Sequence, residues 1–239
     1  MGVGLMGLTE EQIRRVKAAT EDILGSVGFR VAHAGLRELC RKAGATVDEA
    51  REVVRFAPEL LRELLGQIPP AYTIRRIDGC EHRVGGDEQH CLAIVTDPWI
   101  VDYETKRPRR PVLADLRRHT IIAQQLEPVV AVSRMDFPAA DVPGPHSSLR
   151  ALQEHLRYHH KHLHVMPANV ESLEQWLELG AILADDLPLK GSNLLTVGVA
   201  VISPLTISNL NGELLLRACA QGFPIVPTIC PQAGTTSPY

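Results

Sequence analysis

The chain has 239 residues, of which 45% are hydrophobic and 22% charged, a composition typical of globular proteins rather than of disordered ones. Its 25 Lys and Arg side chains against 28 Asp and Glu give a formal net charge of -3. This balance excludes the strongly basic field that holds nucleic acids or anionic membranes, so we expect neither as a partner.

Cysteine usage and hydropathy indicate a cytoplasmic protein. The five cysteines are scattered and form no C-x-x-C pair, which fits neither a disulfide framework nor a zinc ribbon. The longest apolar run, around residues 194–205, is interrupted by Gly198, Ser203 and Pro204 and is shorter than the roughly 20 residues that span a bilayer. We expect it to form a buried strand.

Residues 1–70 are predicted to form a helical extension. Thr9 stands three residues before Gln12 and precedes an amphipathic run that ends at Gly28, the pattern of a capping box followed by a C-terminal glycine. Further helices are predicted from Ala34 to Lys42 and from Pro58 onwards.

Residues 71–110 are predicted to form a β-hairpin cap. Short alternating stretches at 72–74, 90–95 and 99–103 are separated by Gly85-Gly86 and Asp97-Pro98. Turn residues between short alternating runs are typical of antiparallel hairpins.

Residues 111–239 are predicted to form the first half of a (β/α)₈ TIM-type barrel, truncated after about four βα units. After a helical segment at 111–126, four apolar runs alternate with helical ones, which favours a parallel sheet covered on both faces. A doubly wound open sheet is the alternative, but no G-x-G-x-x-G follows any strand. The four expected strands cover residues 129–134, 162–166, 195–202 and 225–230.

Several stretches, taken in order, resemble the trimethylamine methyltransferase family of corrinoid-dependent enzymes. They are LTEEQIRRVKAATEDILGSVGFRV, RFAPELLRELLGQIP, DPWIVDYETKRPRRP, ISPLTIS and AGTTSP. The resemblance implies a (β/α)₈ barrel behind a helical and hairpin extension. It also implies transfer of a methyl group from trimethylamine or a quaternary amine of the glycine betaine type to the Co(I) of a separate corrinoid protein.

The implied partners are the corrinoid protein, which carries the cobalamin, and the methylated amine; no cofactor is expected to bind tightly to this chain itself. A half-barrel has open sheet edges, so we expect a homo-oligomer. Two alternatives stay open: a truncated, non-catalytic fragment that binds a quaternary amine or a partner protein, and an unrelated open-sheet α/β enzyme.

The methyl donor is a cation, so its site needs carboxylates or aromatic faces rather than acid-base groups. Candidate substrate-binding residues follow the expected strands or lie in the hairpins, where helix caps, loop ion pairs and ordinary packing are the alternatives; no catalytic residue is assigned. The candidates are Asp136, Arg134, Gln232, Thr235, Thr236 and Trp99.

Two clusters are interpreted as solvated surface rather than as sites. Five histidines lie between His155 and His164, but no acidic residue completes a zinc motif, so we expect no metal and a basic loop that titrates near pH 6.5. The basic stretch Lys106–Arg110 lacks the aromatic interleaving of a single-strand binder. A docking face for the corrinoid protein is its functional alternative.

Overall fold

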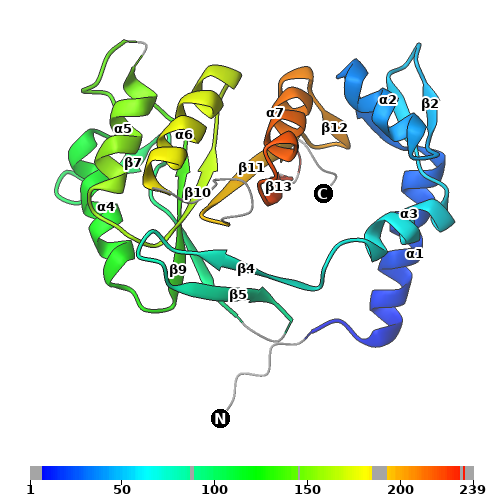
Figure 1. Ribbon diagram of the computed structural model, residues 1–239, viewed down its shortest axis with the longest axis horizontal. Helices are drawn as coiled ribbons and strands as arrows, with labels where there is room; N and C mark the ends of the chain where they lie inside the picture. Colours follow the sequence, from blue (N-terminus) through cyan, green and yellow to red (C-terminus); the bar gives the residue numbers. More distant parts are fainter. Residues whose placement is uncertain (1–6, 87–88, 145, 185–192, 232–233, 235–239) are drawn as a thin grey trace. The chain divides into compact units, whose positions relative to one another are not determined.

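A computed structural model describes residues 7–86, 89–144, 146–184, 193–231 and 234 (Figure 1). The chain forms two compact units. The first comprises residues 1–69, 201–212 and 229–239, and the second comprises residues 70–200 and 213–228. No helix among the described residues is long and apolar enough to cross a membrane.

The first unit joins three helices to a small sheet of strand order β12-β1-β3-β2. The predicted capping box is confirmed, because Thr9 accepts from the Gln12 backbone N–H and Gln12 bonds back to Thr9. The other two predicted helices are confirmed as well. The elements are α1 (Glu10–Ser26), β1 (Phe29–Val31), α2 (Ala34–Lys42), β2 (Thr46–Asp48), β3 (Val53–Arg55), α3 (Pro58–Gly66) and β12 (Thr206–Ile207).

The turn after α1 requires a glycine. Gly28 has a φ of 81°, and a Cβ at this position would lie 2.4 Å from the Val54 carbonyl oxygen. Only glycine combines the left-handed backbone with so close an approach, which explains why the helix ends where the sequence predicted.

The second unit is built on a curled, parallel, five-stranded sheet of order β13-β11-β10-β9-β6. All four predicted strands are present. The prediction for residues 90–95 was wrong: this segment is no antiparallel hairpin but β6, which pairs in parallel with β9. The strands are β6 (Cys91–Ile94), β9 (Val129–Met135), β10 (His162–Met166), β11 (Leu195–Val201) and β13 (Ile225–Ile229).

Helices cover one face of this sheet (Figure 1). The main core lies beneath them, where Leu163 and Leu195 from the strands pack with Leu152, Trp176 and Leu214 from the helices. Each of these side chains is buried, as expected for a parallel sheet flanked by crossover helices. The helices are α4 (Leu113–Gln125), α5 (Ser147–Leu156), α6 (Val170–Leu183) and α7 (Asn209–Ala220).

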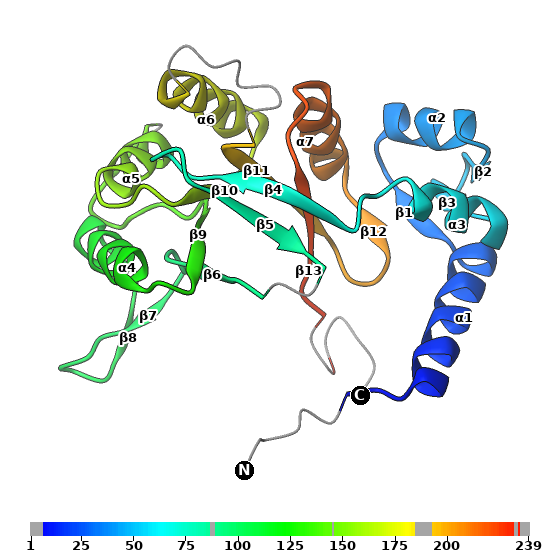
Figure 2. The ribbon, with the colours of Figure 1, turned by 60° about the horizontal axis from the view of Figure 1, so that its bottom comes forward.

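Two antiparallel hairpins complete the second unit. The first, β4 (Ala71–Arg75) with β5 (Glu81–Gly85), packs Ile74 against Val130 and Ala131 of β9. The second, β7 (Ile100–Val101) with β8 (Pro108–Arg109), connects β6 to α4; Figure 2 shows it projecting beside α4. The expected stretches at 72–74 and 99–103 overlap β4 and β7, whereas their partner strands β5 and β8 were not predicted.

Candidate functional site at the carboxyl edge of the sheet

The carboxyl ends of β6, β9 and β10 lie at one edge of the sheet because these strands run parallel. Thr96 and Asp97 follow β6, and Asp136 and Phe137 follow β9. In (β/α) barrels, this edge carries the substrate-binding and catalytic groups. It is therefore the candidate site of the second unit.

Thr96 joins the ends of β6 and β9. Its hydroxyl oxygen accepts a hydrogen bond from the Met135 backbone N–H at 2.8 Å and donates to the Met135 carbonyl at 3.1 Å. The side chain is buried, so this double contact fixes the backbone from which Asp97 and Phe137 project.

Asp136 joins the ends of β9 and β10. Its backbone N–H donates to the Met166 carbonyl at 3.1 Å. One carboxylate oxygen accepts from Arg134 and the other from the Ala168 backbone N–H, each at 3.3 Å. With 6% of its side chain exposed, Asp136 holds two loops of the edge together.

Arg134 lies on the helix-covered face of the sheet rather than at its edge. Its side chain is fully buried, and the guanidinium carbon is 5.1 Å from the centre of the Trp176 ring of α6. Burial lowers the pKa of Arg134, while the Asp136 carboxylate opposes that shift. Among the described residues, its Nε and Nη2 atoms have no hydrogen-bond partner.

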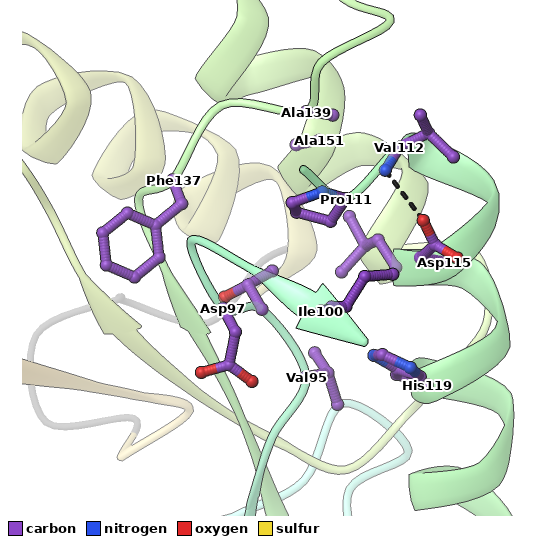
Figure 3. A pocket seen from close by; sticks show the side chains of 12 residues that line it. Val95, Asp97, Ile100, Pro111, Val112, Asp115, His119, Phe137, Ala139 and Ala151 are labelled. Carbon is purple, nitrogen blue, oxygen red and sulfur yellow. Dashed lines mark hydrogen bonds between the residues drawn. The ribbon is translucent and has the colours of Figure 1, made fainter. Parts of the chain in front are cut away.

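A small pocket lies between the β6 and β9 ends and the start of α4 (Figure 3). Asp115 and His119 of α4 line one side, and Figure 3 shows Asp97 and Phe137 on the opposite side. The pocket volume is about 20 Å³, enough for about one water molecule.

Asp115 anchors the α4 side of this pocket. Its carboxylate accepts from the Val112 backbone N–H at 2.9 Å and from Arg109 at 2.7 and 2.9 Å. The Arg109 hydrogen bond is the main reason that the pKa of Asp115 is lowered. Arg109 also donates to Asp102 at 3.0 Å, so one guanidinium ties the β7–β8 hairpin to α4.

The remaining predicted site residues are not brought to this edge by any described contact. Trp99 is exposed on the β7–β8 hairpin, with the Arg110 guanidinium carbon 4.1 Å from the centre of its ring. Gln232, Thr235 and Thr236 lie outside the described residues. Their assignment to substrate binding stays a prediction.

The histidine cluster is not a solvated loop, and that interpretation was wrong. His155, His159, His162 and His164 are all buried. Burial lowers the pKa of His159 to about 3 and that of His155 well below its ordinary value. Only His160 of this cluster is exposed, which means that most of these rings are neutral at pH 7.

Two of the buried histidines line the inner face of the sheet, opposite the helices. His164 Nδ1 is 2.7 Å from the Ser133 hydroxyl, and His162 Nε2 is 2.6 Å from the Thr196 hydroxyl. Burial lowers the pKa of both histidines to about 4. Both rings face a cavity of about 180 Å³ whose other walls include Tyr72.

Sequence reasoning missed Asp97, Thr96, Ser133 and Thr196. Asp97 was assigned to a hairpin turn because Pro98 follows it, although the apolar run before it also fits a buried parallel strand. Thr196 stands between apolar residues of its strand, and Ser133 stands between Val132 and Arg134, which is a weak signal of an inner polar face. Within the described ranges, no group of three or more His, Cys, Asp or Glu side chains is arranged to hold a metal ion.

The second unit is a curled, parallel, five-stranded half-barrel sheet with helices over one face, the arrangement of a partial α/β barrel. Residues 5–239 match the trimethylamine methyltransferase (MTTB) family. The chain belongs to this family.

Two curated relatives match nearly the whole chain. Trimethylamine methyltransferase MttB of Desulfitobacterium hafniense is 21% identical over 238 residues, which is 99% of this chain and 48% of the relative. Trimethylamine methyltransferase MttB1 of Methanosarcina acetivorans is 21% identical over 247 residues, covering 99% of this chain and 49% of the relative. The chain thus spans about half the length of the curated relatives it matches.

Proposed function

We propose that the chain takes part in transferring a methyl group from trimethylamine, or from a quaternary amine of the glycine betaine type, to the Co(I) of a separate corrinoid protein. Membership of the trimethylamine methyltransferase family supports the reaction class. The observation that supports a place in the fold for this reaction is that an acidic residue, Asp97, and an aromatic residue, Phe137, line the same edge pocket (Figure 3).

A carboxylate and an aromatic ring suit a methylated ammonium group. The carboxylate offsets the positive charge, and the negative face of the ring attracts the polarised methyl groups. In the transfer from a quaternary amine, or from trimethylamine already protonated to trimethylammonium, the bond between the methyl carbon and nitrogen breaks. Its electron pair stays on nitrogen, and a neutral amine leaves. The corrinoid supplies the cobalt nucleophile that takes the methyl group.

In this proposal, the residues of this chain hold and orient the substrate and transfer no proton. Thr96 and Asp136 fix the backbone at the ends of the strands, so Asp97 and Phe137 are held before the substrate arrives. Holding the donor with one methyl group directed outward lowers the entropic part of the barrier to in-line transfer. No proton needs to move in this step, which agrees with an edge that contributes a carboxylate and a ring.

The test is a methyl-transfer assay of the purified chain with reduced corrinoid protein, comparing trimethylamine, glycine betaine and proline betaine with a reaction lacking substrate. We expect methylation of the corrinoid with one of these amines. We expect Asp97→Asn to raise KM about tenfold, equivalent to about 1.4 kcal/mol. The exposed α1 residue Asp22 supplies the control Asp22→Asn, which should leave KM unchanged. Absence of transfer with all three amines would contradict the proposal.

A further inference from the structure

The β7–β8 hairpin and its turn carry three exposed aromatic or apolar side chains. Trp99, Val101 and Tyr103 are 54%, 67% and 84% exposed, whereas Ile100 and Asp102 between them are partly buried. Trp99 and Val101 flank Ile100 of the two-residue strand β7, and Tyr103 lies in the turn that follows; we call these three side chains the outward row. Three large exposed side chains in five residues are unusual on a solvated surface.

The opposite face of the hairpin holds it in place. Ile100 lines the edge pocket, and Asp102 bonds Arg109, which reaches Asp115 of α4. Hydrogen bonding by the Thr105 backbone N–H, assisted by Arg109, lowers the pKa of Asp102 to about 2. The carboxylate therefore stays ionised at neutral pH, and the outward row is presented on an anchored ribbon.

Cations stack on the two aromatic rings of the outward row. The Arg110 guanidinium carbon is 4.1 Å from the centre of the Trp99 ring, and the Lys106 ammonium is 3.9 Å from the centre of the Tyr103 ring. The stretch Lys106–Arg110 itself contains no aromatic residue, and two of its cations stack on rings that precede it in the chain. Trp, Tyr and Arg are the residues most enriched among binding hot spots.

The charge of this row defines the chemistry of its partner. Lys106, Arg107 and Arg110 are exposed, whereas Glu104 is the one exposed acid between residues 99 and 110. Arg109 faces inward between two carboxylates and leaves the outward face basic. A complementary partner presents carboxylates around an apolar surface.

The hairpin also lies where a partner must approach the edge pocket. It begins directly after Asp97, and Ile100 lines the same pocket as Asp97 and Phe137 (Figure 3). Figure 2 shows the hairpin extending from the end of β6 beside α4. A protein that brings a reactive group to the pocket rim therefore contacts the hairpin.

We propose that the outward row of Trp99, Val101 and Tyr103, with its stacked cations, is the docking surface for an acidic face of the corrinoid protein. The inference rests on the proposed function for the identity of the partner. The row itself is defined by the exposure of its three side chains and by the cations stacked on its two rings. Two rigid rings with stacked cations supply contact area with little loss of side-chain freedom.

The test measures binding, separately from turnover. The probe is purified corrinoid protein of trimethylamine-dependent methyl transfer in its cob(II)alamin state, titrated into the full chain by biolayer interferometry. We expect Trp99→Ala and Tyr103→Ala each to raise Kd at least tenfold. Lys106→Glu/Arg107→Glu should raise Kd and remove most of its salt dependence. Lys17→Glu on α1, a charge reversal at another exposed lysine, is the matched control and should leave Kd unchanged.

The outcomes separate docking from catalysis. Wild-type binding that the hairpin variants weaken supports the docking surface, even if no amine is demethylated. Equal binding by wild-type chain and hairpin variants overturns it, even if methyl transfer occurs. Tighter binding of a labelled single-stranded oligonucleotide than of the corrinoid protein would also overturn it. So would a change of self-association in Trp99→Ala measured by sedimentation, because a second copy would then be the occupant.

Discussion

At the scale of single residues, His162 and His164 make stability depend on pH. Burial lowers the pKa of each to about 4, below the value of about 6.5 in an unfolded chain. The unfolded state therefore binds more protons as the pH falls below about 6.5, and stability is lost from there down to about pH 4. Each ring contributes a slope of up to about 1.4 kcal/mol per pH unit.

We expect His164→Asn to reduce the slope of unfolding free energy against pH by the contribution of one ring, up to about 1.4 kcal/mol per pH unit. Asn does not titrate, and its side chain can still bond the Ser133 hydroxyl. Urea unfolding followed by circular dichroism at pH 7, 6, 5 and 4.5 measures the slope. The exposed His146 provides the control His146→Asn, whose pH profile should match that of the wild type. An unchanged slope in His164→Asn would show that this ring titrates in the folded state.

Arg134 and Asp136 form the buried ion pair of β9. Removing one member of such a pair leaves the other charge buried and unpaired, which costs about 3 kcal/mol or more. We expect Arg134→Met to destabilise the chain by about this amount in urea unfolding. Arg14→Met, which removes one side of the exposed Arg14–Glu11 pair, should change stability by less than about 0.5 kcal/mol. Equal effects of the two substitutions would contradict the buried-pair interpretation.

At the scale of elements, Arg109 ties the β7–β8 hairpin to α4. Arg109 donates to Asp102 and, through two nitrogens, to Asp115. We expect Arg109→Met to leave the sheet intact and to increase local opening of the hairpin. Hydrogen exchange read by mass spectrometry should show faster exchange in residues 99–118 and unchanged exchange in β9 and β10. Arg107→Met, on the same hairpin, is the control, and it should leave hydrogen exchange unchanged in residues 99–118 and in β9 and β10.

Sequence pattern predicted elements well where local signals and burial agree. The helix from Thr9 to Gly28 carries both a cap and a terminal glycine, and β9, β11 and β13 are mainly apolar runs that each follow a helix. β6 was misassigned because its direction depends on pairing with β9, some 40 residues away, and no local signal encodes that partner. The buried histidines were misjudged for a similar reason, since the walls that desolvate them come from distant segments.

The candidate site was predictable only in outline. Its location at the carboxyl edge follows from parallel strands, and Asp136 was identified by its place after a strand. The sequence did not reveal that Arg134 faces the helices. Neighbouring residues such as Ser133 and Arg134 point to opposite faces of a strand, but which face is which is known only from the register of β9 with β10. The sequence also could not show that Asp97 and Phe137, which are 40 residues apart, line one pocket, because the parallel pairing of β6 with β9 brings their segments together.

At the scale of the whole molecule, β6 and β13 are the outer strands of the five-stranded sheet. Pro227 lies in β13 and lacks a backbone N–H, which makes that edge a poor template for a further strand. At the two ends of β6, the backbone N–H groups of Cys91 and Val95 donate to carbonyls of the β9 segment. The alternate groups, those of Leu92 and Ile94, therefore face outward. We infer that β6 is the edge through which copies associate.

We expect the purified chain to associate with itself, and Ile94→Lys to weaken that association about tenfold, because a charge on an edge strand disfavours further pairing. Sedimentation velocity over a concentration series measures the change. Leu39→Lys on α2, which alters a side chain of similar exposure away from any sheet edge, is the control and should leave association unchanged. A wild-type chain that sediments as a single 26.2 kDa species at all concentrations would contradict association. Equal weakening by both substitutions would place the contact elsewhere than the β6 edge.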